Sequence, residues 1–205
     1  MSRNSEMKKK IRSAFPNIHF YMEAVSIKHL CIQEYEIDNT AYLLKDIDIE
    51  NRICTVDKID HHGGLFSVAS TSIPLDENKI FSIKNARTVC FIPIDGKNGL
   101  LGGISNCDFV FWNKKDFCFV ELKLNATIIE DRPIRKNRKK AISQLKNTID
   151  FFDSKLGKDY SDLNLQAYVA TPDVYPRENT AWQSLKVEFL EEVGIDLFEN
   201  RVKIY

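Results

Sequence analysis

Two short runs rich in aromatic and β-branched residues lie close together in the middle of the chain and constrain its fold most strongly. Residues 107–112 read CDFVFW and residues 117–123 read FCFVELK, with only the polar residues NKKD at 113–116 between them. This composition favours β-strands, and so short a polar break predicts a hairpin. Turns of two or of four residues both fit the break and give the same register. The sequence therefore predicts an antiparallel pair in which Trp112 faces Phe117.

The same register places two carboxylates, Asp108 and Glu121, directly opposite each other. Residues in this relation have Cβ atoms roughly 4.5–5.5 Å apart, and like charges there are destabilising. Lys123 lies two residues after Glu121 and therefore on the same face of its strand. The other positions of both runs are mostly apolar, which is typical of central strands covered on both faces. Since charged groups are rarely buried without partners, we expect these three side chains to share a ligand.

A divalent cation suits this cluster, because Mg²⁺ prefers oxygen ligands and is usually held by one or two protein carboxylates. A neighbouring ammonium could position an attacking water or offset negative charge on a reacting phosphate. The alternative is that Glu121 and Lys123 form a solvated pair on an edge strand, while Asp108 merely begins the preceding strand. The apolar context of both runs favours a metal or phosphate site.

This arrangement resembles the PD-(D/E)xK nuclease superfamily, in which one strand carries an acidic residue and the next carries Asp or Glu, any residue and Lys. Asp108 would be the first acid, and Glu121-Leu122-Lys123 would supply the remainder of the motif. The resemblance implies an α/β (α+β) fold, with a central mixed β-sheet flanked by helices in a restriction-endonuclease-like core. It also implies Mg²⁺ or Mn²⁺ held by Asp108, Glu121 and the backbone carbonyl of Leu122.

A long helix is predicted after the second run. Its apolar stripe at helical spacing consists of Ile142, Leu145, Ile149, Phe152 and Leu156, and Gly157 predicts its end. Gln144 lies beside this stripe, one turn after Lys140. Several branches of the superfamily carry a glutamine on this helix near the active site, so the resemblance implies a role for Gln144. The tyrosine that some of them have four residues later is Thr148 here.

The helix opens with the most basic segment of the chain, at residues 131–140. Its candidate nucleic-acid-binding residues are Arg132, Arg135, Lys136, Arg138, Lys139 and Lys140. A solvated basic face would explain this composition equally well, but its place directly after the candidate metal site favours contact with phosphates. Because the formal net charge of the chain is zero, contact with DNA has to come from such a local patch.

The whole chain of 205 residues is predicted to form one domain with an N-terminal extension. Residues 1–86 are expected to form a helix at 5–14 and then a β-rich part, and residues 87–205 the nuclease-like core, with a helix at 179–193 and strands at 165–170 and 202–205. Superfamily members often carry an extra acidic ligand before the core strands. Glu23, Glu34 and Glu36 are candidates that the sequence does not separate.

Several classes of function lack their residues in this chain. The five cysteines form no C-x-x-C pair, and the histidines have no zinc spacing, so the thiols are expected to be reduced core residues. No Walker A loop, dinucleotide fingerprint or G-x-S-x-G motif occurs. Without an apolar segment long enough for a signal peptide or a membrane span, we expect a soluble cytoplasmic protein.

The sequence thus predicts a metal-dependent nuclease that hydrolyses phosphodiester bonds, in DNA rather than RNA. Lys123 would position the attacking water, and Gln144 with Lys140 would orient that lysine or a phosphate. A chain this small could act as a homodimer or beside a partner subunit, and family analogy alone suggests a restriction or phage-defence setting. The alternative is a non-catalytic nucleic-acid-binding or assembly subunit that retains the nuclease fold.

Overall fold

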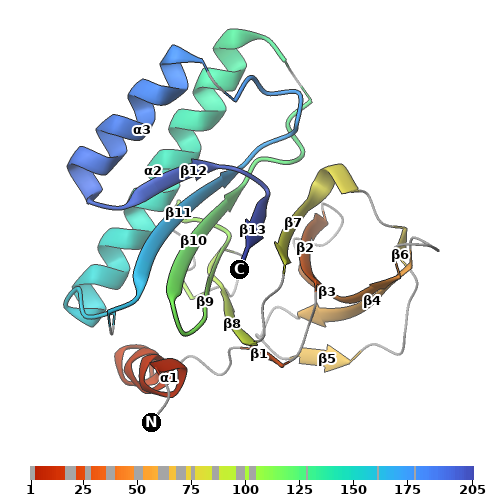
Figure 1. Cartoon of the computed structure of the whole chain (residues 1–205), viewed down its shortest axis with the longest axis vertical. Coiled ribbons are helices and arrows are strands. Elements are labelled where there is room, and N and C mark those ends of the chain that lie inside the picture. The colour runs from red at the N-terminus through yellow and green to blue at the C-terminus, as the bar shows by residue number, and fades with distance from the viewer. Residues whose placement is uncertain are drawn as a thin grey trace.

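A computed structural model of the chain shows two β-sheets and three α-helices among the residues that it describes (Figure 1). These residues are 3–16, 22–25, 29–35, 40–48, 53–59, 65–67, 73–74, 77–84, 88–95, 100–101, 105–127, 129–160, 162–177 and 179–205. The helices are α1 (Arg3–Ala14), α2 (Asp131–Leu156) and α3 (Thr180–Val193), with a short 3₁₀ helix at Glu77–Lys79. None of the helices in these ranges combines the length and the apolar character needed to cross a membrane.

The first sheet has six strands in the order β1-β8-β9-β10-β11-β12. Their bounds are β1 Met22–Val25, β8 Thr88–Pro93, β9 Phe109–Trp112, β10 Asp116–Leu122, β11 Asn164–Ala170 and β12 Asp196–Glu199. In this sheet β1, β8, β9 and β10 pair antiparallel with their neighbours. Strands β10, β11 and β12 run parallel, and helices α2 and α3 make the crossover connections between them. The predicted α+β class, with a central mixed sheet flanked by helices, is confirmed.

The second sheet joins strands from both ends of the chain. It has the order β13-β7-β2-β3-β4-β5, with β6 pairing beside β4. The bounds are β13 Val202–Ile204, β7 Ile80–Lys84, β2 His29–Tyr35, β3 Thr40–Asp48, β4 Ile53–Ile59, β5 Leu65–Ser67 and β6 Ile73–Pro74. The C-terminal strand β13 pairs parallel with β7, so the C-terminus ends between the two sheets (Figure 1).

Apolar side chains cover both faces of the first sheet, and alternation along β10 sorts its residues between them. Phe117 and Phe119 pack in a cluster with α1, α2 and α3, whereas Cys118 and Val120 pack with Phe81 of β7. Strands covered on both faces need continuous apolar runs, which explains the composition of residues 107–123. The same alternation places Glu121 on the helix side of the sheet, where α2 crosses it.

Helix α2 is the principal cover of this face. Its buried residues include Leu145, Ile149 and Phe152, as the apolar stripe predicts. The helix ends at Gly157, whose φ of 64° lies in the left-handed region that favours glycine. Helix α1 begins at Arg3, earlier than the predicted start at residue 5. Phe15, directly after the end of this helix, packs on Phe152 with ring centroids 5.2 Å apart. The N-terminal helix therefore shares the core of the first sheet.

Candidate active site

The candidate site lies where strand β10 ends and strand β9 begins. The two strands pair in the predicted register, from Trp112 with Phe117 to Phe109 with Val120. Asp108 directly precedes β9, and its backbone continues the sheet: its N–H donates to the Val120 carbonyl at 3.0 Å, and its carbonyl accepts from Ile94 N at 2.8 Å. Neighbouring strands on both sides therefore fix the position of Asp108.

The side chains of Asp108 and Glu121 meet at this edge. The Asp108 carboxylate accepts a 2.5 Å hydrogen bond from the backbone N–H of Leu122, the residue after Glu121. The Glu121 side chain is only 2% exposed and forms an ion pair through Oε1 with the ammonium of Lys123. Two acids and one base thus lie together on adjoining strand ends. The paired register itself ends at Phe109 with Val120, and the Asp108 N–H bonds to Val120 rather than to Glu121, the residue predicted to lie opposite it.

Gln144 of helix α2 holds the lysine from the other side. Its Oε1 accepts a 3.1 Å hydrogen bond from Lys123 Nζ, and its Nε2 donates to the carbonyl of Asn106 at 2.8 Å. The ammonium also lies 3.4 Å from the carbonyl oxygen of Leu122. The structure therefore brings Asp108, Glu121, Leu122, Lys123 and Gln144 together.

The electrostatics of this cluster favour a positive ligand. Burial, followed by the negative charge of Asp108, raises the pKa of Glu121 well above its ordinary value of 4.5, although Lys123 opposes the shift. The second oxygen, Oε2, is buried and accepts no hydrogen bond within the described part of the chain. A buried carboxylate oxygen without a donor, beside a second carboxylate, fits a divalent cation.

Such a cation would depend on few protein ligands. Among the described residues, no group of three or more His, Cys, Asp and Glu side chains is arranged to hold a metal. Two carboxylates and one carbonyl, with water completing the shell, match the sparse coordination that Mg²⁺ accepts. Of the candidate extra acids, Glu23 lies on β1 and Glu34 lies on β2, but their side chains are outside the described part of the structure. Glu36 lies entirely outside it.

The raised pKa of Glu121 predicts how the stability of the metal-free protein depends on pH. In the folded state Glu121 holds a proton that it releases near pH 4.5 in the unfolded state. Its contribution to the free energy of unfolding is therefore fully present below pH 4.5 and is lost as the pH rises toward the folded-state pKa. The slope is at most about 1.4 kcal/mol per pH unit. Urea unfolding in a chelator, from pH 5 upward, should show this decline in wild type and a flatter profile in Glu121→Gln. Parallel profiles of the two proteins would contradict the burial of this acid.

The basic segment divides between two faces of helix α2. Five of its candidate residues are exposed and follow one another at helical spacing: Arg132, Arg135, Lys136, Lys139 and Lys140. We call these five the basic stripe. Lys140 lies one turn before Gln144, so the stripe runs along the helix toward the candidate site.

Arg138 is the exception, and the prediction that it contacts phosphate is wrong. Its side chain is 2% exposed and forms a bidentate ion pair with Glu199 of β12. Nε lies 2.8 Å from Glu199 Oε1, and Nη2 lies 2.6 Å from Oε2. Nη2 also donates to the carbonyl of Pro176 at 2.7 Å, and the guanidinium stacks over the Trp182 ring at 5.2 Å. Arg138 therefore anchors α2 to β12 inside the protein.

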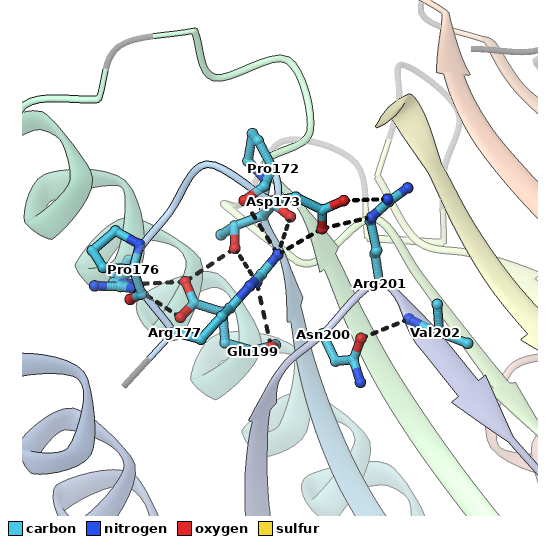
Figure 2. A network of polar contacts seen from close by, with 10 residues as sticks. Pro172, Asp173, Pro176, Arg177, Glu199, Asn200, Arg201 and Val202 are labelled. Carbon is cyan, nitrogen blue, oxygen red and sulfur yellow. Dashed lines mark hydrogen bonds and ion pairs between the residues drawn. The ribbon is translucent and has the colours of Figure 1, made fainter. Parts of the chain in front are cut away.

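A second arginine extends this anchor toward the surface (Figure 2). Nη1 of Arg177 donates to the hydroxyl of Thr171 at 2.6 Å, and that hydroxyl donates to Glu199 at 3.0 Å. Asp173 accepts from Arg177 and also pairs with Arg201, whose hydrogen bond lowers the pKa of Asp173. The loop after β11 is thereby tied to the turn between β12 and β13.

Sequence reasoning assigned no site role to the polar residues that support the cluster. The hydroxyl of Thr148 accepts a 2.9 Å hydrogen bond from the backbone N–H of Cys107, the residue before Asp108. Its spacing four residues after Gln144, on a buried helix face, was the available indication. Glu199 carried no comparable local indication.

Comparison with known proteins adds nothing to this geometry, because no protein-family model, no curated protein and no solved structure matches the chain.

Proposed function

We propose that this protein is a metal-dependent nuclease of the PD-(D/E)xK type, which hydrolyses phosphodiester bonds of DNA. The observation that carries the proposal is the convergence of Asp108, Glu121 and Lys123 on one side of two adjoining strand ends, with Gln144 against the lysine. Two carboxylates and an ammonium in one place match the needs of phosphodiester hydrolysis, in which negative charge develops on a phosphate.

Asp108 and Glu121, with the carbonyl of Leu122, would hold one or two Mg²⁺ or Mn²⁺ ions. The buried Glu121 Oε2, which has no hydrogen-bond donor among the described residues, supports this assignment. When bound, the cation would supply Lewis-acid stabilisation of phosphate charge and lower the pKa of water. The protein's own part would be to hold the Asp108 carboxylate in place through Leu122 N, while Lys123 Nζ occupies Glu121 Oε1 until the cation binds.

Lys123 would position the attacking water and offset charge on the scissile phosphate. Its ammonium is only partly exposed, and Gln144 Oε1 directs it at 3.1 Å. Gln144 is itself held by the carbonyl of Asn106 at 2.8 Å, so the lysine is oriented before substrate binds. Orientation in advance matters because a preorganised charge needs no rearrangement in the transition state.

The basic stripe would bind the phosphate backbone of the substrate. Its five cations are exposed on one helix, whereas the chain as a whole has a formal net charge of zero. Contacts from Lys and Arg to phosphates position a duplex without reading its sequence. Because Lys140 lies one turn from Gln144, DNA bound along the stripe would lie close to Asp108 and Glu121.

The direct test is an assay of the wild-type protein on double-stranded DNA, single-stranded DNA and RNA, with Mg²⁺, Mn²⁺ or a chelator. We expect cleavage of DNA with either metal, loss of cleavage in the chelator and recovery when excess metal is added. Mn²⁺ and DNA binding without cleavage of any substrate would contradict the nuclease proposal and favour a non-catalytic nucleic-acid-binding subunit.

The basic stripe yields a prediction for DNA binding. Lys136→Gln with Lys140→Gln should weaken binding to all duplex sequences alike and reduce the slope of log K against log salt by up to about 0.9 per lost contact. The matched control is Lys114→Gln with Lys115→Gln, which removes two exposed lysines at the hairpin turn, the end of β9 and β10 away from Asp108. Equal slopes for the two double variants would show that the stripe does not bind phosphates.

A further inference from the structure

Three side chains of helix α2 fasten the chain segment that leads into strand β9. Gln144 Nε2 donates to the Asn106 carbonyl at 2.8 Å, and Asn147 Nδ2 donates to the carbonyl of Ser105 at 2.8 Å. Thr148 Oγ1 accepts from the backbone N–H of Cys107 at 2.9 Å. Consecutive residues 105–107 are thus each bound to the same helix, directly before Asp108.

Thr148 makes the most constrained of these contacts. Its side chain is fully buried, and its one hydroxyl serves two partners: it accepts from Cys107 N and donates to the backbone carbonyl of Gln144 at 3.0 Å. The hydroxyl therefore joins the residue before Asp108 to the residue that orients Lys123. The opposite ends of the candidate site are connected through this one oxygen atom.

We propose that Thr148 is a positioning residue, which sets Asp108 relative to Lys123; the inference rests on the proposed nuclease function. Strand β10 carries Glu121 and Lys123, whereas Asp108 follows a segment that contacts α2. Loss of the hydroxyl would leave the buried N–H of Cys107 without its partner, and the segment would have to move to satisfy it. Asp108 is the next residue, so its carboxylate would move with the segment.

Four variants test this role. Thr148→Val replaces the hydroxyl by a methyl group of similar size, Thr148→Ala removes both groups, and Thr148→Ser keeps the hydroxyl. Comparison of Ser with Ala isolates the hydroxyl even if valine perturbs the fold. Ser154→Ala is the matched control, since Ser154 lies on the same helix and its exposed hydroxyl donates to the nearby Phe151 carbonyl at 2.7 Å.

Thr148→Val and Thr148→Ala should reduce kcat or Mn²⁺ affinity by roughly 10- to 100-fold, the usual effect of removing a group that supports a metal ligand. KM for DNA should be unchanged, because the basic stripe is intact. In metal-free protein, the Cys107 amide should exchange its hydrogen roughly three- to tenfold faster, as expected when one hydrogen bond is lost. Thr148→Ser and Ser154→Ala should resemble wild type in all three measurements.

The outcomes separate the two proposals. Unchanged Cys107 exchange, Mn²⁺ affinity and kcat in Thr148→Ala would overturn the positioning role, as would a loss that Thr148→Ser does not restore. A wild-type protein that cleaves nothing contradicts the proposed function instead. In that case the exchange rate of Cys107 still decides whether Thr148 holds this segment, and unchanged exchange contradicts it.

Discussion

Lys123→Ala is expected to bind Mn²⁺ at least as tightly as wild type and yet to cleave DNA on the order of 10²–10³ times more slowly. The ammonium forms an ion pair with Glu121, so it would compete with a cation for that carboxylate, and its removal should ease metal binding. Its contribution to the proposed hydrolysis would be made mainly in the transition state, when charge develops on the phosphate. Metal binding and catalysis should therefore separate at this residue.

Calorimetric titration with Mn²⁺ beside the cleavage assay measures both effects. Asp108→Asn is the matched comparison, because it removes a charge that would hold the metal and should abolish Mn²⁺ binding and cleavage together. Cleavage by Lys123→Ala at the wild-type rate would show that the lysine is structural, and the mechanism would then be wrong. A Lys123→Ala protein that no longer binds Mn²⁺ would contradict the assignment of roles.

Arg138→Met is expected to cause the largest loss of stability, about 3–5 kcal/mol, because it leaves a buried carboxylate without its partner. The Glu199 side chain is only 1% exposed and binds both Nε and Nη2 of Arg138. Adding Glu199→Gln to Arg138→Met removes the uncompensated charge and should recover part of the loss. Urea unfolding measures the free energy of each variant.

Lys139→Met is the control for Arg138→Met, since it replaces the next cation of the same helix at an exposed position. Surface substitutions of this kind usually change stability by less than about 0.5 kcal/mol. Equal stability of the two methionine variants would contradict the anchoring role of Arg138. A double variant less stable than Arg138→Met alone would show that buried charge is not the cause.

The parts of the fold that depend on neighbouring residues could be predicted from the sequence. The hairpin register follows from two apolar runs and a short polar break, and it places Asp108 near the end of β10, just beyond the paired residues. The end of α2 follows from its apolar stripe and Gly157. Strand β12 was not predicted, because its four residues carry too little pattern, and the pairing of β13 with β7 joins segments far apart in the chain.

The position of Arg138 was predictable in part. It lies four residues after the buried Ile134 and four before Ile142, so the helical period that predicts the apolar stripe also places Arg138 on the buried face. The number of basic residues in the segment does not reveal this position, because it does not distinguish the buried face of the helix from the exposed face. Its partner Glu199 lies on β12, and no local pattern links residues so distant.

The candidate site depends both on local sequence patterns and on tertiary packing. Gln144 meets Lys123 through the packing of α2 on the sheet.

The most direct test of the central proposal is a crystal of the wild-type protein soaked in Mn²⁺, with anomalous scattering recorded to locate the ion. Mn²⁺ is expected between the carboxylates of Asp108 and Glu121, within reach of the Leu122 carbonyl, with Lys123 displaced from Glu121. No ion between these carboxylates at high Mn²⁺ concentration, with the Lys123 to Glu121 ion pair intact, would contradict the assignment of a metal-dependent active site.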